Sequence, residues 1–196
     1  MPRTDAPSPR VRALIEDIAL YGAMLQVEAR DLYGDSTLKR AKERWVEVKE
    51  TCQGNVLYLS HRGRQVQGYA SAYSPPEEAL VNNLAERQVA KVLEAEGMRL
   101  QQGPLKHTFD VLDNGHSFTF AARHTGFNFR SIRRLYRQTV LDGDTPQLRV
   151  YVPAELIPGL AEDVAMKNRG SPLWIEPDSL LIEAIPSYTP KRQRGG

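Results

Sequence analysis

The sequence is poor in features that mark several large classes of protein. Its 196 residues include a single cysteine, Cys52, which excludes an internal disulfide and a zinc cluster built from cysteines. No apolar run approaches the length of about 18 residues that a membrane span requires. The start of the chain, from Met1 to Arg10, is polar and proline-rich and has no signal-peptide pattern. We therefore expect a cytoplasmic protein without a membrane segment.

An excess of charge of one sign is also missing. The chain has 26 lysines and arginines against 24 acids, which leaves a net charge of +2. Any attraction to nucleic acid must therefore come from local patches and not from the field of the whole molecule. With 41% hydrophobic and 26% charged residues, the composition is typical of a globular chain with one large domain or two small ones.

Common catalytic motifs are absent as well. The sequence has no Gly-x-Ser-x-Gly elbow and no glycine-rich phosphate loop. His107, His116 and His124 could lie near one another across a hairpin, but no carboxylate or cysteine spacing accompanies them. Since a metal ion needs a complete set of ligands, we expect neither a metal site nor another cofactor.

The first half of the chain predicts three helices followed by a β-rich run. Gly22 ends the first helix, and Asp35 or Ser36 fits the N-cap of the third. The β-rich run extends from Asn55 to Ser60, and three helices followed by such a segment predict a winged helix. Apolar residues at helical spacing place the three helices at residues 10–21, 26–33 and 37–49.

The third predicted helix has the character of a recognition helix. Leu38, Ala41, Trp45 and Val48 fall on one narrow stripe at about 100° per residue, and Trp45 would anchor that stripe in the core. A charged outer face on a helix that follows a glycine-containing turn suits the reading of DNA bases. The alternative is an ordinary solvated amphipathic helix. The candidate DNA contacts here are Thr37, Lys39, Arg40, Lys42, Glu43 and Arg44.

These helices, followed by Tyr58-Leu59-Ser60-His61-Arg62-Gly63-Arg64, resemble the winged-helix domain of the replication-relaxation family of plasmid and mobile-element DNA-binding proteins. The resemblance covers roughly the first half of the chain. It implies that the third helix enters the major groove of double-stranded DNA and that the wing touches the backbone. On this basis Arg62 and Arg64 are expected near phosphate groups.

A long helix from Glu77 to Glu96 is expected after Ser74-Pro75-Pro76, which stops any earlier helix. Its first turn is acidic, and Gly97 closes it. A helix in this position either forms a homodimer or packs onto a second domain, and the sequence leaves both open.

From Leu105 onward the apolar period changes to two. Asp113-Asn114-Gly115 supplies the positive φ angles of a tight hairpin turn between two strands. Strands then alternate with helices, which predicts a small α/β domain with some parallel pairing. The expected segments are the strands 106–112 and 116–123, a helix at 128–141, a strand at 147–152, a helix at 153–168 and a strand at 172–176.

A hairpin, a helix and a strand in this order are also found in a restriction-endonuclease-like core, which the family named above sometimes carries. Magnesium-dependent cleavage there needs an acid on one strand and a Glu-x-Lys pair on the next. Asp110 could be the first acid, but Ala121 and Ala122 stand where the second carboxylate is needed. We therefore expect a degenerate, non-catalytic domain and no enzyme.

The predicted helix at 128–141 carries a second cationic surface. Four arginines share an arc of about 100° opposite an apolar side, and no acid interrupts them before Asp142. A DNA backbone would neutralise these guanidinium groups and release counterions. Alternatively, acids from neighbouring helices pair with them. The four residues are Arg130, Arg133, Arg134 and Arg137.

Together these patterns predict an α+β protein that binds double-stranded DNA and regulates transcription, plasmid replication or DNA maintenance. The alternative is a protein–protein interaction module built on the winged helix. The expected organisation is a flexible arm at 1–9, a winged helix at 10–73, a connecting helix at 77–97, a small α/β domain at 104–188 and a basic tail at 189–196.

Overall fold

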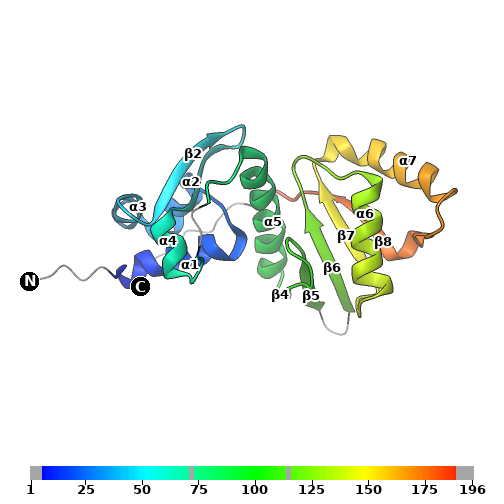
Figure 1. Ribbon diagram of the computed structural model, residues 1–196, viewed down its shortest axis with the longest axis horizontal. Coiled ribbons are helices and arrows are strands. Elements are labelled where there is room, and N and C mark those ends of the chain that lie inside the picture. Colours follow the sequence, from blue (N-terminus) through cyan, green and yellow to red (C-terminus); the bar gives the residue numbers. More distant parts are fainter. Residues whose placement is uncertain (1–5, 71–72, 114–115, 189–196) are drawn as a thin grey trace, which may run out of the picture. The chain divides into compact units, whose positions relative to one another are not determined.

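The computed structural model describes residues 6–70, 73–113 and 116–188 (Figure 1). It contains a three-stranded antiparallel sheet and a five-stranded mixed sheet together with helices, so the expected α+β class is confirmed. The chain divides into two compact units, one up to Leu84 and one from Ala85 to Tyr188. Most of the expected arm and all of the expected basic tail lie outside the described residues.

The first unit has the element order of a winged helix. Its small sheet has the order β1-β3-β2, and both strand pairs are antiparallel. Gly22 ends the first helix in the left-handed conformation, with φ at 82°, and its N–H donates to the carbonyl oxygen of Ile18. The elements are α1 (Pro9–Tyr21), β1 (Met24–Leu25), α2 (Gln26–Tyr33), α3 (Asp35–Lys42), β2 (Val46–Thr51) and β3 (Gly54–Leu59).

The core of this unit lies between the helices and the sheet. Leu14, Ile15 and Ile18 of α1 are fully buried, and they share one apolar cluster with Ala41 of α3 and Leu57 of β3. These α1 residues recur at helical spacing, so a single face of the helix enters the core. The packing fixes α3 with one side inward and the other outward.

The third helix is shorter than its sequence spacing predicts. It ends at Lys42, Trp45 lies in the following turn, and Val46 begins β2. Val46 and Val48 pair with Leu59 and Leu57 of β3, and Val48 is 38% exposed. The predicted extension to Lys49 is therefore wrong, because ladder pairing of β-branched residues outweighs an apolar repeat that also fits a helix.

The expected N-cap of the third helix is wrong too. Gly34, with φ at 82°, holds that position, and no side chain caps this end of α3. Asp35 is the first helical residue, and its carboxylate pairs instead with Arg30 at 3.0 Å. A glycine here lets α2 pass into α3 with a single intervening residue.

The wing is the hairpin of β2 and β3, which turns at Cys52 and Gln53 between the paired residues Thr51 and Gly54. Arg62 and Arg64 do not lie on it. They lie on the short helix α4 (His61–Val66) that directly follows β3, and their expected contact with phosphate stays a prediction. The strand β2 is not among the predicted elements, although the alternation of Val46 and Val48 carries its signal.

The helix α5 (Glu77–Ala95) matches the long helix expected at 77–96, and Gly97 follows it with φ at 90°. The division between the two units falls within this helix, after Leu84. In the first unit Leu80 and Leu84 form a small buried cluster with Val56 and Tyr58 of β3. Their apolar surface is therefore used within the chain.

The second unit is built on one mixed sheet of order β4-β5-β6-β7-β8 (Figure 1). The first three strands pair antiparallel, and β6, β7 and β8 pair in parallel, which confirms the expected parallel pairing. Its elements are β4 (Arg99–Gln102), β5 (Phe109–Asp113), β6 (His116–Ala122), α6 (Phe129–Tyr136), a π-helical turn (Arg137–Leu141), β7 (Leu148–Val152), 3₁₀ turns at Ala154–Leu156 and Pro177–Ser179, α7 (Ile157–Asn168) and β8 (Leu180–Ala184).

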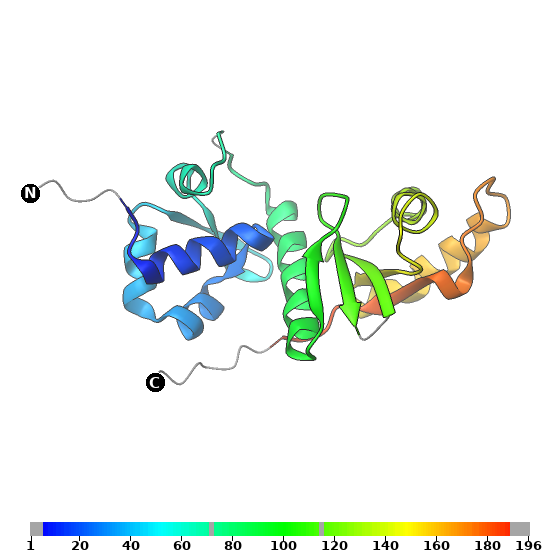
Figure 2. The same ribbon diagram turned by 90° about the horizontal axis from the view of Figure 1, so that it is seen from below.

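The helices α6 and α7 pack together with β7 and β8 around one apolar cluster (Figure 2). Ile132 and Tyr136 of α6 and Leu160 of α7 meet Leu148 and Val150 of β7 in this cluster. Alternate residues of a strand face opposite sides, so Leu148 and Val150 point to the helices while Arg149 points away. The sheet thereby fixes which side of α6 is buried.

Two strands of this sheet differ from the prediction. The segment 172–176 is not a strand, because the side-chain amide of Asn168 bonds to the backbone N–H and carbonyl of Ile175, at 2.9 and 2.8 Å. The parallel strand is β8 instead, and β4 was not expected at all. In the hairpin, Asp113 pairs with His116 as the turn signal predicts, and the turn residues 114–115 lie outside the described residues.

Candidate nucleic-acid interface

The helix α3 presents a cationic face. Lys39, Arg40 and Lys42 are exposed, whereas Leu38 and Ala41 are buried in the core of the first unit. Burial of one side and exposure of the other follow from the helical repeat, in which positions three and four apart share a face. The lysines and arginine are thus directed away from the core, as a DNA-reading helix requires.

Thr37 lies on the buried side of the same helix. Its side chain is 5% exposed, because it stands four residues before Ala41 on the inner face. The Thr37 side chain is therefore turned away from the surface that Lys39 and Arg40 form, and a contact of Thr37 with DNA stays a prediction.

Glu43 and Arg44 are exposed, but they lie in the turn after α3 and not on the helix. The hydroxyl of Ser60 donates to the carbonyl oxygen of Arg44 at 2.6 Å, which ties this turn to the end of β3. Lys42 Nζ donates to Gln26 Oε1 of α2 at 2.9 Å. The turn that carries Glu43 and Arg44 is thus tied to the end of β3, and the Lys42 side chain is tied to α2.

Arg62 and Arg64 of α4 have different surroundings. Arg62 is exposed, whereas the Arg64 guanidinium lies over the rings of Tyr69 and Tyr73, at 4.8 and 5.4 Å from their centroids. A cation above an aromatic face is held by the ring quadrupole. Arg62 is accordingly the more accessible of the two for a phosphate group.

The helix α6 carries the second cationic surface on its solvent side. Phe129, Ile132 and Tyr136 are buried on its inner side, which bears out the predicted division into an apolar and a charged face. Asn128 is the N-cap, and it forms a capping box with Ser131. The four arginines of this helix segment are exposed or half-buried: Arg130, Arg133, Arg134 and Arg137.

These arginines line a concave groove with a volume of about 840 Å³, which we name the arginine groove. The turn that follows α6 and the segment before Ile175 complete its wall. The residues that line it are Asn128, Arg130, Ser131, Arg133, Arg134, Arg137, Gln138, Asp142, Pro172 and Leu173.

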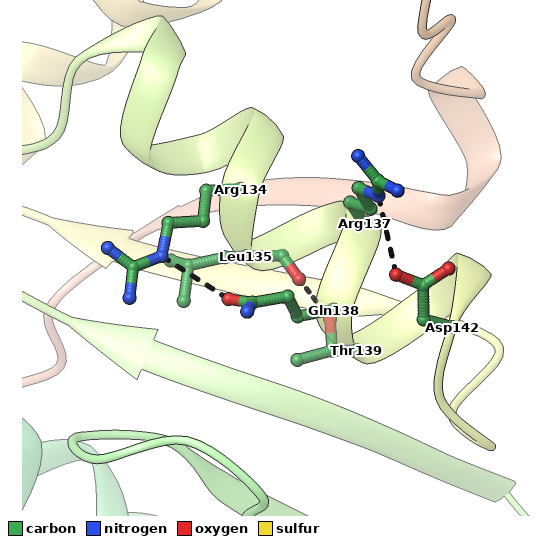
Figure 3. Close-up of polar contacts among 6 residues, drawn as sticks. All are labelled: Arg134, Leu135, Arg137, Gln138, Thr139 and Asp142. Carbon is green, nitrogen blue, oxygen red and sulfur yellow. Dashed lines mark hydrogen bonds and ion pairs between the residues drawn. The ribbon is translucent and has the colours of Figure 1, made fainter.

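Two of the four guanidinium groups have side-chain partners (Figure 3). Arg137 Nε lies 3.3 Å from Asp142 Oδ2, and Arg134 Nε donates to Gln138 Oε1 at 3.3 Å. The Arg137–Asp142 pair is exposed on both sides, so it contributes little to stability. Within the described residues, Arg130 and Arg133 have no acidic partner. Among the described residues, the one acid that pairs with these arginines is Asp142, which directly follows their own helical segment and does not come from a neighbouring helix.

Asp110, the candidate first acid of an endonuclease-like site, lies on β5. Its carboxylate accepts a hydrogen bond from Thr119 Oγ1 of β6 at 2.6 Å, and Thr119 also lies 2.9 Å from the hydroxyl of Thr145. Ala121 and Ala122 are buried further along β6. Across the described part of the chain, no group of three or more histidine, cysteine, aspartate or glutamate side chains could hold a metal ion.

Two of the histidines contact α5 separately instead of forming one cluster. His107 Nδ1 lies 3.0 Å from a carboxylate oxygen of Glu86, and His124 Nε2 lies 3.2 Å from Gln88 Oε1. Burial raises the pKa of the Glu86 carboxyl, while the hydrogen bond from His107 opposes that shift. Burial lowers the pKa of His124. The side chain of His116 lies outside the described part.

No protein-family model matches the chain, and no curated protein sequence matches it. The proposals below therefore rest on the structure of the chain itself, chiefly on the cationic surface of α3 and on the arginine groove. Among the helices of the described residues, none is long and apolar enough to cross a membrane.

Proposed function

We propose that this protein binds double-stranded DNA through α3 and thereby regulates transcription, plasmid replication or DNA maintenance. The observation that supports the proposal is the face formed by Lys39, Arg40 and Lys42, which is exposed on the third helix of a unit with winged-helix element order. In winged-helix and helix-turn-helix proteins this helix enters the major groove, where base edges can be read.

Each exposed side chain has a role in this proposal. Lys39, Arg40 and Glu43 reach base edges, since arginine and lysine donate to guanine and glutamate accepts from cytosine. Arg62 contacts a phosphate group from the neighbouring helix α4, which provides affinity without sequence information. Lys42, the last residue of α3, and Arg44, in the turn after it, contact the sugar-phosphate backbone of the DNA.

Several further features belong to the same proposal. A protein with this role would act in the cytoplasm and would be related in function to the replication-relaxation family that its first half resembles. A homodimer through α5 remains a prediction, which light scattering would test. Phosphate contacts by the arginines of α6 are a separate matter, because those residues line a groove in the other unit.

Substitution of the α3 cations tests the proposal. The double variant Lys39→Gln/Arg40→Gln should lower affinity for a duplex selected from a random pool by at least tenfold, since each lost charged hydrogen bond contributes about 1.5–3 kcal/mol. Fluorescence anisotropy measures this affinity directly. The matched control is Arg10→Gln/Arg12→Gln, which removes two exposed charges of α1. Wild-type affinity in the first variant, or an equal loss in the control, would contradict a recognition role for α3.

The second candidate is a protein-interaction module. Two large apolar side chains of the first unit favour it, because Leu20 of α1 is 57% exposed and Val27 of α2 is 58% exposed. A gel shift with random duplex at low salt separates the candidates. Binding supports the DNA proposal, and its absence at low salt favours a protein partner, since non-specific DNA binding is strongest there.

A further inference from the structure

The arginine groove has the shape of a small-ligand site. Its volume of about 840 Å³ falls within the range of roughly 300–1,000 Å³ that is usual for pockets that enclose small molecules and cofactors. The concavity and this volume suit a compact ligand better than the long, wide surface of the duplex that α3 is proposed to bind.

The charge of the groove indicates an anion with more than one negative group. Its lining contains four arginines and one acid, Asp142, so the formal excess is four minus one, or +3. A single carboxylate would leave most of this charge uncompensated. The planar fork of a guanidinium donates two parallel hydrogen bonds to phosphate oxygens, which makes linked phosphates the best match.

The side chains, and not the end of the helix, provide the donors. At the N-terminus of α6 the Ser131 N–H donates to Asn128 Oδ1 at 2.8 Å, and the Asn128 N–H donates to Ser131 Oγ at 3.1 Å. This capping box uses two of the N–H groups that a helix N-terminus would otherwise offer to an anion. The guanidinium groups are therefore the main donors of the groove.

The π-helical turn after α6 orients two of these groups (Figure 3). It places Gln138 beside Arg134 and Asp142 beside Arg137, and both contacts are made through the Nε atom at 3.3 Å. The terminal nitrogens of both guanidinium groups stay available for a bidentate contact. Turns of this type recur at functional sites, where the wider helix repositions side chains.

We propose that the arginine groove binds a nucleotide-sized ligand with two or more linked phosphates, at a site separate from the α3 surface. The phosphates meet Arg130, Arg133, Arg134 and Arg137. Pro172 and Leu173 form a less polar part of the lining, which suits the base or sugar of such a ligand. This inference goes beyond DNA binding and holds whether or not α3 reads a duplex.

Calorimetric titration of the full chain tests the inference, with ATP, inorganic tripolyphosphate and orthophosphate as probes in the absence of magnesium. We expect saturable binding of ATP and tripolyphosphate at one site and at least tenfold weaker binding of orthophosphate. The variant Arg130→Gln/Arg133→Gln should weaken ATP binding at least tenfold, since it removes two charged donors. Neither arginine has an acidic partner within the described residues, so the fold should persist, which circular dichroism checks.

The matched control is Arg99→Gln/Lys106→Gln, which removes two exposed cations of the same unit outside the groove. ATP affinity should stay unchanged there. A further variant, Arg137→Lys, keeps the charge and removes the fork, and it should weaken ATP more than orthophosphate. The inference is overturned by absent binding of both ATP and tripolyphosphate, by an equal loss in the control, or by unchanged ATP affinity in the groove variant.

Duplex DNA distinguishes this inference from the proposed function. If the wild-type chain does not bind ATP and the groove variant loses affinity for duplex DNA, these arginines contact a DNA backbone. That result would overturn the small-ligand site. The variant Lys39→Gln/Arg40→Gln tests α3 independently, because it should impair duplex binding and leave ATP binding intact.

Discussion

His124 and Glu86 are two ionisable side chains of the second unit whose burial opposes their charge. Burial lowers the pKa of His124, against an opposite influence from Glu155. It raises the pKa of Glu86, which is 3% exposed and lies beside His107. Both shifts make the stability of this unit depend on pH, because the folded and unfolded states bind different numbers of protons.

The sign of the His124 effect follows from its lowered pKa. Below about pH 6.5 the unfolded imidazole takes up a proton while the folded one resists it, so stability falls as the pH drops through that value. The variant His124→Gln lacks this titration and can still reach Gln88. We expect the wild type to lose more stability than the variant between pH 8 and pH 5, as measured by urea unfolding midpoints.

Glu86 has the opposite sign, since stability falls as the pH rises through its raised pKa. Its contribution is common to both proteins and cancels in the comparison. The unfolding midpoints of the wild type and the variant at pH 8, where His124 is neutral in the folded and the unfolded state, are the reference values. Equal losses in the wild type and the variant would show that the burial of His124 does not influence folding.

At the scale of elements, the sequence correctly predicts those helices and strands that local patterns determine. The bounds of α2 and the hairpin of β5 and β6 follow from apolar spacing and from the turn at 113–115. The strand β2 was missed because Trp45 and Val48 also fit a helical repeat, and only pairing with β3 decides between the two. The segment 172–176 looks like a strand in sequence, but contacts of Asn168 hold it as a loop.

The candidate surfaces also have features that the sequence predicts and features that it does not. The exposed arginines of α6 follow from helical spacing, which assigns each residue to a face. The concavity of the groove does not, because Pro172 and Leu173 reach it from a segment about 40 residues downstream of Arg133. Thr37 lies four residues before the buried Ala41, so helical spacing places its side chain on the inner face.

The close packing of α4 gives a prediction at this scale. Gly63 is buried, and a Cβ atom there would overlap the backbone carbonyl oxygen of Trp45. The carbonyl cannot move easily, since it already accepts the Ser60 N–H at 3.0 Å. Gly63→Ala should therefore destabilise the first unit by about 1–3 kcal/mol in chemical unfolding, which is the usual cost of overpacking.

A glycine of α7 provides the control. A Cβ at Gly159 meets no atom within 4 Å, so Gly159→Ala should leave the second unit as stable as before or stabilise it by up to about 1 kcal/mol. If Gly63→Ala unfolds at the wild-type midpoint, α4 does not depend on close approach to Trp45.

For the whole molecule, the net charge of +2 implies that the proposed DNA binding would depend on a few local contacts. Each phosphate contact releases counterions and adds about −0.9 to the slope of log affinity against log salt concentration. Arg62→Gln, which removes one proposed phosphate contact of α4, should reduce that slope by about 0.9 for every duplex sequence. Arg40→Gln should instead cost about 1–3 kcal/mol on the preferred sequence and relax the preference.

Anisotropy titrations of a preferred and a scrambled duplex at several salt concentrations separate these two effects. Arg12→Gln, which removes an exposed charge of α1, should change neither the slope nor the preference. A wild-type slope near zero between low and moderate salt would contradict phosphate contact altogether. The overall charge supplies little attraction, so the salt slope should depend on particular side chains. If three or more single-charge variants on different helices all reduced the slope equally, no single surface would be responsible for DNA binding.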